Sequence, residues 1–485
     1  MLKHNWLLVS GLALMFLLGC TQPVSPAPAP IPEPAPVVTP APEPSLARSP
    51  TSAPEPSPAP KPVPISPSDT TPPSAIAGLG AVDACDGNVN LWWDKSQSND
   101  FDHYAVYVSK EALSDVADLT SVHQINDIDS NYYQATGLEL SVPFFFAVTA
   151  VDKSGNESSK VTAAKAMPTP MPEGVSDSDL VVSTYHSDRT WPGTTLLADN
   201  HKAERPRMIE VNMRGEITWE YRLPPDLKRY NNPGFEGEHL PNGNILILLP
   251  GHGVYELNRD AEIVWSYIDR KVSHDADRLP SGNTLVVFGN GDQINDAQVK
   301  EISPEGKVVW SWYARDHFNK APYKAIADQG WTHTNAVMRL PNGNTIISPR
   351  NFDCLVEVDP QGALVRTIGE GVFDNQHDPE ALSSGNILLA NHGKPHRVIE
   401  FDPTTEKVVW QTRGFARELT PVRDANRLPN GNTLITATTK IVEVTPAGEV
   451  VWELKLKGLT LAGLEGAKLG FYKAERINIQ PQKSD

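Results

Sequence analysis

The chain has 485 residues, and 39% of them are apolar, which is enough for more than one folded domain. Its formal net charge is −17, from 59 acidic and 42 basic residues. This balance argues against a nucleic-acid or anionic-membrane partner, because either would need a basic face. An anionic substrate would have to be held by a local cluster of positive groups.

The first 20 residues have the pattern of an export signal. Lys3 precedes an apolar run that ends in LLGC at residues 17–20, and this run is short for a bilayer span. The ending resembles a bacterial lipobox, in which the cysteine is acylated. We therefore expect a lipoprotein signal peptide over residues 1–20 and lipidation at Cys20. Thr21, in place of an aspartate, favours the outer membrane, facing the periplasm or the cell surface.

Residues 21–73 repeat Pro, Ala, Ser and Glu, so they have too little apolar surface to fold. We expect an extended tether. Residues 74–168 differ, because short alternating apolar runs lie at residues 89–93, 103–109 and 144–152, between turn-rich stretches. The order WW, YAVY, FAVTAVD resembles a fibronectin type III β-sandwich, with phenylalanines where a tyrosine is usual. A spacer or binding role is expected there.

The three cysteines predict no disulfide and no metal site. Cys20 is expected to carry lipid, while Cys85 and Cys354 fall in different predicted domains, which disfavours a bridge between them. No Cys-x-x-Cys pair or metal-type Cys/His spacing occurs. Cys85 is expected to be a small buried residue.

From about residue 179 the chain repeats a unit: LPNGNTL, a strand, then V-x-E with a P-x-G turn, then a strand ending on tryptophan. Five clear copies and a degenerate one at 191–198 predict four strands each, with Asn and Gly at positive φ in the turn. The fourth copy has Ile368 near the place of the tryptophan. Six such units predict an all-β chain with a six-bladed β-propeller over residues 179–480.

The first copy lacks a strand directly before its turn, and the C-terminus supplies one. YKAERI at residues 472–477 matches RDANRL at 423–428 in residue type at several positions. We therefore expect this C-terminal strand to complete the first blade and close the ring.

The first strand of each blade faces the axis of a propeller, so its residues line the hub. Each of these strands has an apolar residue just before the turn. Five positions before that residue, the strands carry mostly large polar or aromatic side chains. Because side chains alternate between the two faces of a strand with period two, these groups share one face. His333 lies two residues before Asn335 on the same face, and Arg350 follows the second strand of blade four. His239 falls at another register and is expected at the surface, and no position is assigned to His392 or His396, for which the rim is one interpretation. The reference set is Tyr472, Phe235, His274, Asn335, His377 and Arg423.

This arrangement predicts a cationic, hydrogen-bonding cup that suits a tetrahedral anion. Group transfer from such an anion needs positioning, charge stabilisation and a nucleophile, and a neutral imidazole serves as one. The alternative is a set of hydrogen-bonded histidines at blade junctions without a function.

The segments WTHTNAVMRLPNGNTIISPRN (331–351) and QHDPEALSSGNILLANHG (376–393) resemble bacterial aryl-sulfate sulfotransferases, six-bladed propellers with hub histidines. The resemblance covers residues 180–477. It implies that His377 takes a sulfuryl group from a phenolic sulfate and passes it to a second phenol, without the nucleotide donor PAPS.

The resemblance also implies roles for the remaining hub residues. His333 and Arg350 would neutralise sulfuryl oxygens, although Pro349 departs from the family's serine–arginine motif. Asn335 would donate a hydrogen bond, and His274 would protonate or stabilise the leaving phenolate. Arg423, Tyr472 and Phe235 are added as substrate-binding residues from the register alone.

The expected partners are a small aryl sulfate and a phenol, with membrane contact through the lipid only, no nucleic acid, no cofactor and no metal. The oligomeric state stays open. One alternative is a non-catalytic surface propeller that binds glycans or proteins, and a quinoprotein dehydrogenase is disfavoured by the six turns and the histidine hub. A lyase or lactonase would need axial carboxylates, whereas the register places Asp275, Asp378 and Asp424 on the opposite strand face.

Overall fold

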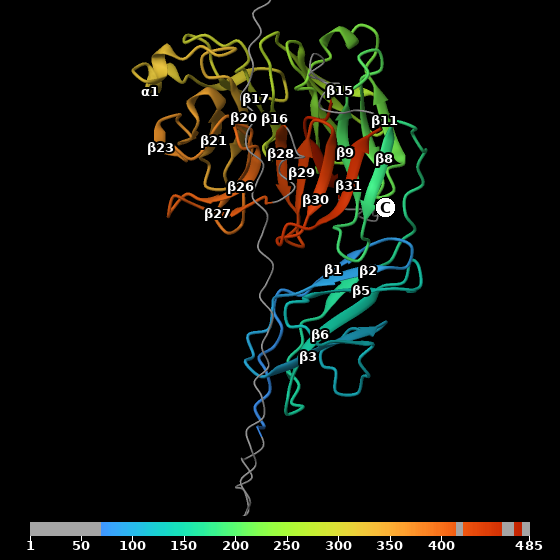
Figure 1. Cartoon of the computed structure of the whole chain (residues 1–485). Helices are drawn as coiled ribbons and strands as arrows, with labels where there is room; N and C mark the ends of the chain where they lie inside the picture. Colours follow the sequence, from blue (N-terminus) through green and yellow to red (C-terminus); the bar gives the residue numbers. More distant parts are fainter. Residues whose placement is uncertain (1–68, 414–420, 458–469, 478–485) are drawn as a thin grey trace, which may run out of the picture. The chain divides into compact units, whose positions relative to one another are not determined.

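The computed structural model describes residues 69–413, 421–457 and 470–477 (Figure 1). The predicted signal peptide, Cys20 and most of the tether lie outside these ranges. Within them the regular secondary structure is almost entirely β-strand, with one short helix, α1 (Arg315–Phe318), and a few 3-10 turns. No helix in the described ranges is long and apolar enough to cross a membrane.

The first β-region forms two antiparallel sheets, and the three runs that the sequence predicted as strands are among their members. The three-stranded sheet has the order β1-β2-β5 and the four-stranded sheet the order β4-β3-β6-β7. The strands are β1 (Gly80–Asp83), β2 (Val89–Trp92), β3 (Phe101–Ser109), β4 (His123–Ile125), β5 (Tyr132–Ala135), β6 (Phe144–Asp152) and β7 (Ala164–Ala166).

These two sheets share one apolar core. Leu91 of β2, Val106 of β3 and Phe146 of β6 belong to the same cluster of buried residues, and each is at most 1% exposed. Cys85 is free and buried, and burial raises the pKa of its thiol to about 12, so it behaves as a small apolar residue, as expected.

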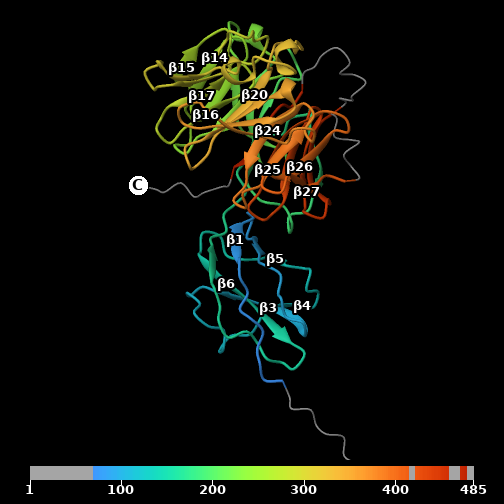
Figure 2. The same ribbon diagram turned by 90° about the vertical axis from the view of Figure 1, so that its left-hand side faces the viewer.

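The remaining strands form six antiparallel sheets, numbered here in chain order (Figure 2). Sheet one has the order β11-β10-β9-β32, and sheets two to five each contain four consecutive strands. Sheet six has the order β28-β29-β30-β31-β8.

The strands of the first three of these sheets follow the repeat. They are β9 (Thr194–Asp199), β10 (Arg207–Val211), β11 (Ile217–Arg222), β12 (Glu236–His239), β13 (Ile245–Leu249), β14 (Gly253–Leu257), β15 (Ile263–Ile268), β16 (Ala276–Arg278), β17 (Thr284–Val287), β18 (Val299–Ile302) and β19 (Val308–Trp312).

The other three sheets follow the same repeat, and the last of them gains β8 from the start of the region. They contain β20 (Thr334–Arg339), β21 (Thr345–Pro349), β22 (Leu355–Val358), β23 (Leu364–Ile368), β24 (Gln376–Ala381), β25 (Ile387–Asn391), β26 (Arg397–Asp402), β27 (Lys407–Gln411), β28 (Val422–Arg427), β29 (Thr433–Ala437), β30 (Lys440–Val444), β31 (Val450–Leu456) and β8 (Leu180–Tyr185). The fourth strand of sheet one is β32 (Ala474–Ile477).

Both ends of the repeat region pair with distant strands. β32 pairs antiparallel with β9 of sheet one, which is the pairing expected for the C-terminal strand. β8, at the other end, adds a fifth strand to sheet six by pairing with β31, as Figure 1 shows. Each sheet contacts the next in chain order, and β29 of sheet six contacts β32 of sheet one, so the contacts form a closed cycle.

The first strands of neighbouring sheets contact one another along the inside of this cycle, for example β20 with both β16 and β24. Residues at the start of these strands therefore meet residues from other sheets. Apolar clusters fill the space between successive sheets, and the one between sheets one and two includes Met208, Phe235 and Ile247.

The repeated turn differs in one detail from the prediction. Gly243, Gly282, Gly343, Gly385 and Gly431 have φ between 85° and 91°, whereas no asparagine of these turns has a positive φ. In sheet two the Gly243 N–H donates to Leu240 O and the Leu240 N–H donates to Asn244 O. Only glycine takes the left-handed position, which is the geometry of a type I turn followed by a bulge.

The second asparagine of each turn explains why a glutamate recurs in V-x-E. Its Nδ2 donates to a glutamate carboxylate on the third strand of the same sheet, at 2.6–2.7 Å. The pairs are Asn244–Glu256, Asn283–Glu301, Asn344–Glu357, Asn386–Glu400 and Asn432–Glu443. Two motifs that are distant within each repeat therefore form one contact.

An arginine before the turn links four of these glutamates to the following sheet, whereas Glu357 pairs with Arg366 of its own sheet. In sheet four, Arg339 lies 2.7 Å from Glu301 of sheet three, and its guanidinium lies over the ring of Trp310, 5.7 Å from the centroid. Arg278, Arg427 and Arg476 make the same two contacts with the preceding sheet.

Candidate functional site

Most predicted site residues lie where the first strands begin. His274 precedes β16 by two residues, and His333 lies directly before β20. His377 and Arg423 are the second residues of β24 and β28, while Tyr472 lies two residues before β32. Five different sheets therefore supply these five side chains.

Ring contacts connect four of them. The imidazoles of His274 and His333 meet edge to face, with centroids 4.9 Å apart. The ring of Tyr472 lies 6.3 Å from that of His274, and the guanidinium of Arg423 lies over Tyr472, 5.3 Å from its centroid. Residues separated by up to 198 positions are thus brought into one group.

A second group of rings surrounds His377. His392 stacks on His377, with centroids 4.7 Å apart and an angle of 26° between the planes, and His396 meets His392 edge to face at 5.6 Å. Arg423 and His274 lie close enough to His377 to affect its protonation, so the two groups adjoin. The sequence left open whether His392 lies at the rim, and in the structure its ring stacks against His377.

Backbone carbonyls determine which ring nitrogen carries the proton in three of these histidines. The Nδ1 atoms of His333, His377 and His392 lie 3.1, 2.9 and 3.0 Å from the carbonyl oxygens of Gln329, Asn375 and Val422. A carbonyl oxygen only accepts, so each Nδ1 donates and each Nε2 keeps its lone pair.

Burial keeps these imidazoles neutral. Burial first, and then the charge of Arg350, lowers the pKa of His333 to about 4, while burial and Arg423 lower the pKa of His392 to about 4. Burial also holds the pKa values of His274 and His377 well below their ordinary value. Near neutral pH the site therefore presents neutral imidazoles, and Nε2 of His377 keeps a lone pair that no described residue occupies.

Arg350 forms one side of the group. Its Nη1 lies 3.4 Å from Nε2 of His333, and its Nη2 donates to Asp328 at 3.0 Å. It lies in the 3-10 turn that follows β21, so the proline that interrupts the expected serine–arginine motif ends the strand and does not displace the arginine from His333.

Arg423 carries a positive charge without a carboxylate partner among the described residues. Its Nε donates to Thr438 Oγ1 at 3.1 Å, and its guanidinium lies against Tyr472. Burial lowers the pKa of Arg423, and the nearby Tyr472 only partly opposes that effect. A partly buried cation without a counter-ion is costly, so this group favours a bound anion.

Asn335 is 2% exposed and links two sheets. Its Nδ2 donates to the backbone oxygen of Gln376 at 2.9 Å, whereas its buried Oδ1 has no hydrogen-bond partner in the part of the chain that the structure describes. Nδ1 of His274 is likewise buried and without a partner. Both atoms are free to bond to a ligand.

Phe235 does not lie with the polar residues. It is 0% exposed and packs in the apolar cluster between sheets one and two. The first strand of sheet two begins at Glu236, and it is this carboxylate that contacts the axial residue Lys473. The placement of Phe235 in the substrate site was therefore wrong, because its side chain is enclosed in the core.

The repeat itself contains the signal that would have identified His392. Counting from the turn asparagines Asn344 and Asn386, Arg350 and His392 both stand six residues later. Thr438 stands at the same position after Asn432 and accepts the hydrogen bond from Arg423. Aligning the ends of the second strands, as well as the first, would have placed all three at the site.

The aspartates next to the histidines meet at Lys473, whereas the prediction placed them on the opposite strand face. Oδ1 of Asp275 and Oδ1 of Asp378 lie 2.6 and 2.9 Å from Nζ of Lys473. Alternation fails because the strands are irregular at these points. The pairing of β24 with β25 shifts between His377 and Glu380, and His274 and Asp378 have φ of +63° and +44°.

A cavity of about 900 Å³ opens on the other side of Lys473. Its lining includes Asp275, Asp378 and Lys473 but none of the four histidines near His377. Further carboxylates surround it: Glu236, Glu238, Asp277, Glu301, Asp424 and Glu475. An anion is disfavoured there, so the lysine separates a carboxylate-lined cavity from the histidines.

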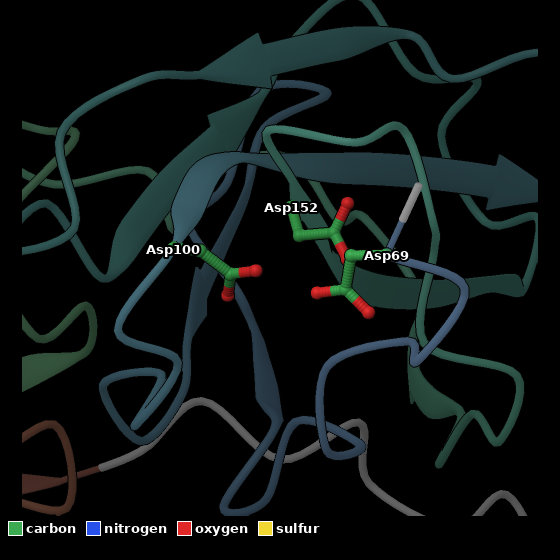
Figure 3. A group of neighbouring side chains, drawn as sticks. All are labelled: Asp69, Asp100 and Asp152. Carbon is green, nitrogen blue, oxygen red and sulfur yellow. The ribbon is translucent and has the colours of Figure 1, made fainter. Parts of the chain in front are cut away.

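A separate group of three aspartates lies in the first β-region. Asp69, Asp100 and Asp152 point toward one another in Figure 3. Among the described residues it is the one group of three or more His, Cys, Asp or Glu whose ligand atoms all lie within 4.8 Å of one another. Asp152 accepts hydrogen bonds from Ser154 and Asn156, so local bonds already explain its burial.

One family model matches this chain, over residues 180–377, and its description is arylsulfotransferase (ASST). The matched segment contains His274, His333, Asn335 and Arg350 and ends at His377. The match supports the arylsulfotransferase family for this part of the chain. No curated protein matches the chain.

Several solved structures are similar to parts of the chain. A protein of unknown function from Bacteroides caccae is 19% identical over 55% of this chain and 95% of its own, with a TM-score of 0.42. Virginiamycin B lyase from Staphylococcus aureus is 11% identical over 73% of this chain and 99% of its own, with a TM-score of 0.34. FN3tt is 18% identical over 20% of this chain and 97% of its own, with a TM-score of 0.17. Scores this low carry no argument about function.

Proposed function

We propose that this chain is an aryl-sulfate sulfotransferase that moves a sulfuryl group between phenols through a sulfohistidine at His377, without PAPS. The observation that carries the proposal is the state of His377. Its Nδ1 donates to Asn375 O, its Nε2 is free, and its pKa is held well below the ordinary value by burial. A neutral imidazole with a free, oriented lone pair is a competent nucleophile at neutral pH.

In the first half-reaction, Nε2 of His377 attacks the sulfur of the aryl sulfate. The Nε2–S bond forms, the bond from sulfur to the phenolic oxygen breaks, and the phenolate leaves with the electron pair. The ring becomes a cation that carries a sulfonate, and the Nδ1–H bond to Asn375 O strengthens as that charge develops. Arg423 and Arg350 are the cations available to the sulfuryl oxygens.

His274 stabilises the phenolic oxygen and does not protonate it in the resting state. Its pKa is well below the ordinary value because of burial and the charges of His333 and Arg350, so it is neutral near pH 7. Its unpartnered Nδ1, in the protonated tautomer, donates a hydrogen bond to the leaving oxygen.

In the second half-reaction, the acceptor oxygen attacks the sulfur, the Nε2–S bond breaks, and His377 returns to its neutral form. The phenolic proton passes to Nδ1 of His274, which is then in the tautomer protonated at Nε2, and from there to solvent. The first phenolate takes up one proton from solvent, so the overall exchange is balanced. His274 therefore donates a hydrogen bond from Nδ1 as one neutral tautomer and accepts a proton at the same atom as the other.

The distribution of charge supports one direction of approach for an anionic donor. Arg350 and Arg423 lie on the histidine side of Lys473, whereas the cavity on the other side is lined by carboxylates. A sulfate ester is attracted to the first side and repelled from the second, so we propose that it binds from the histidine side.

The proposal includes the architecture that the sequence indicated. The cyclic contacts of six sheets support a six-bladed β-propeller over residues 179–480, with β32 closing the first blade. The two sheets that share a core support a fibronectin type III-like domain over residues 74–168.

We also propose that the chain is exported and anchored through a lipid on Cys20, at the outer membrane. The support is the pattern of residues 1–20 and the Pro-rich segment that follows. Mass spectrometry of the N-terminal peptide from the membrane fraction tests this, since an unmodified Cys20 or an uncleaved signal would contradict it.

Sulfuryl transfer is the first measurement. The full chain, purified in detergent micelles, is mixed with 4-nitrophenyl sulfate and phenol in the absence of PAPS, and nitrophenolate release is followed by absorbance. We expect release that depends on phenol, that is lost in His377→Ala and that persists in His239→Ala, because His239 lies at the turn end of β12.

Each outcome has a defined meaning. Release that survives in His377→Ala retains the transferase and moves the nucleophile to another residue. A lack of release with several phenolic acceptors contradicts the transferase and favours a non-catalytic propeller that binds glycan or protein ligands. Intact-mass analysis after exposure to donor alone adds an independent check, since a sulfohistidine adds one sulfuryl group to the chain.

A further inference from the structure

Lys473 lies at the centre of a cluster of carboxylates directly beside the histidines. Its Nζ is 2.9 Å from Glu236, 2.6 Å from Asp275 and 2.9 Å from Asp378. These carboxylates belong to sheets two, three and five, whereas the lysine belongs to the C-terminal segment that completes sheet one. An ammonium has three N–H donors, which matches the three carboxylates in number.

Two of these carboxylates are adjacent in sequence to site histidines. Asp275 follows His274 and Asp378 follows His377. We propose that Lys473 is a positioning residue for the sulfuryl-transfer site: by holding Asp275 and Asp378, its ammonium fixes the orientation of His274 and His377. The inference rests on the proposed function, because it assigns the lysine a role in that site.

The backbone at both dipeptides needs such a restraint. His274 and Asp378 adopt φ of +63° and +44°, a left-handed conformation that costs about 1 kcal/mol or more for a residue with a Cβ. Asp275 is held at both oxygens, because Oδ2 accepts from the backbone N–H of Val337 at 2.7 Å while Oδ1 faces Lys473. The strained turn before β16 is therefore tied to sheet four and to the C-terminal segment at once.

The carboxylates around Lys473 stabilise its ammonium form. Burial alone would lower the pKa of Lys473, but Asp275, Asp378 and Glu236 raise it well above its ordinary value. Asp424, which lies next to Asp378, has a pKa raised by burial and by that neighbour. Without the ammonium, the buried carboxylates of Glu236 and Asp275 and the partly exposed carboxylate of Asp378 would repel one another.

The residue before Lys473 reinforces the same link. Tyr472 contacts His274 and lies beneath the guanidinium of Arg423. The C-terminal segment thus closes the cycle of sheets through β32 and orients three residues of the site through Tyr472 and Lys473. Ring closure and site geometry depend on the same few residues.

The test replaces the ammonium and measures catalysis and local order separately. Lys473→Met removes the charge from a side chain of similar length, and Lys473→Arg retains the charge. The control, Lys300→Met, removes a lysine of sheet three that pairs with Asp269. The side chain of Lys300 is 21% exposed and that of Lys473 is 16% exposed. The full chain in detergent is assayed with 4-nitrophenyl sulfate and phenol.

We expect Lys473→Met to lower kcat about 10- to 100-fold with KM within about 3-fold, because a misplaced nucleophile costs rate more than binding. Lys473→Arg should recover part of the rate, and Lys300→Met should resemble the parent chain. An unchanged kcat in a folded Lys473→Met, or an equal loss in Lys300→Met, would overturn the inference.

Hydrogen–deuterium exchange measured by mass spectrometry tests the same inference without activity. Peptides that contain His274 and His377 should exchange faster in Lys473→Met and at the parent rate in Lys300→Met. If the parent chain transfers no sulfuryl group, this arm still shows whether Lys473 orders the two histidines. If Lys473→Met does not fold, Asp378→Asn replaces it, and unchanged exchange and kcat in that variant would contradict the inference.

Discussion

Replacing Arg423 with methionine should make the protein more stable and less active. In the free protein its guanidinium is satisfied by Thr438 Oγ1 and the face of Tyr472, with no carboxylate among the described residues. Removing a partly buried charge that has no counter-ion among the described residues should raise the free energy of unfolding by about 1 kcal/mol, after the loss of one hydrogen bond. That corresponds to about 2–4 °C in Tm for each kcal/mol in a domain of this size.

The same substitution removes a cation from the proposed sulfate site. A hydrogen bond to a charged group is worth about 1.5–3 kcal/mol, so kcat/KM for 4-nitrophenyl sulfate should fall about 10- to 150-fold. The assay follows nitrophenolate release by the full chain, and thermal unfolding is measured on the same preparation with and without inorganic sulfate. Sulfate should raise the Tm of the parent chain more than that of Arg423→Met.

Arg207→Met is the matched control for a buried arginine that has counter-ions. Arg207 is 1% exposed and lies 2.7–3.0 Å from Asp199, Asp177 and Glu220. Its loss leaves buried carboxylates unpaired and should destabilise the chain by about 3–5 kcal/mol. If Arg423→Met destabilises the chain as much as Arg207→Met does, or if it keeps full activity, then Arg423 does not serve as the cation that binds the anionic donor.

The remaining predictions concern buried charges elsewhere in the six sheets. Burial and the nearby Glu475 raise the pKa of Glu238 to about 8, so ionisation of this group weakens the fold as pH rises from about 4.5 to 8. The Tm of Glu238→Gln should match that of the parent chain near pH 4.5 and exceed it increasingly toward pH 8. A Tm difference that does not depend on pH would contradict this prediction. Arg476 and Glu443 form a fully enclosed ion pair that joins sheets one and six. Arg476→Met should lower the free energy of unfolding by about 3–5 kcal/mol, and adding Glu443→Gln to that variant should recover part of the loss. If the two substitutions lower Tm additively, the pairing is contradicted.

The repeat determined much of the architecture because its residues make the same contacts in each sheet. The glycine, the second asparagine and the V-x-E glutamate recur because the turn needs a positive φ and the asparagine bonds to the glutamate. The fourth copy lacks the tryptophan, and the fifth copy has Ala381 in place of the arginine that would lie over it. The two departures from the repeat therefore remove both partners of one contact.

Period-two alternation predicted the direction of side chains less reliably at the site than within the sheets. His274, His333 and His377 were predicted together, and the structure places them in adjoining groups. Phe235 and the aspartates were misplaced, because period-two alternation holds only in regular strands, and irregular backbone interrupts it at His274, His333 and Asp378. His392 was missed because only the first strands of the repeat were aligned.

The sequence by itself determined the number of repeating units, the four-strand pattern of each, the pairing of the C-terminal strand and most residues that meet near the axis. These depend on local periodicity and on spacing that recurs along the chain. Tertiary structure alone decided which nitrogen of His377 carries the proton, that Arg423 has no counter-ion among the described residues, and that Lys473 binds carboxylates from three sheets. Those properties arise from burial and from contacts between distant segments, and no short-range pattern encodes them.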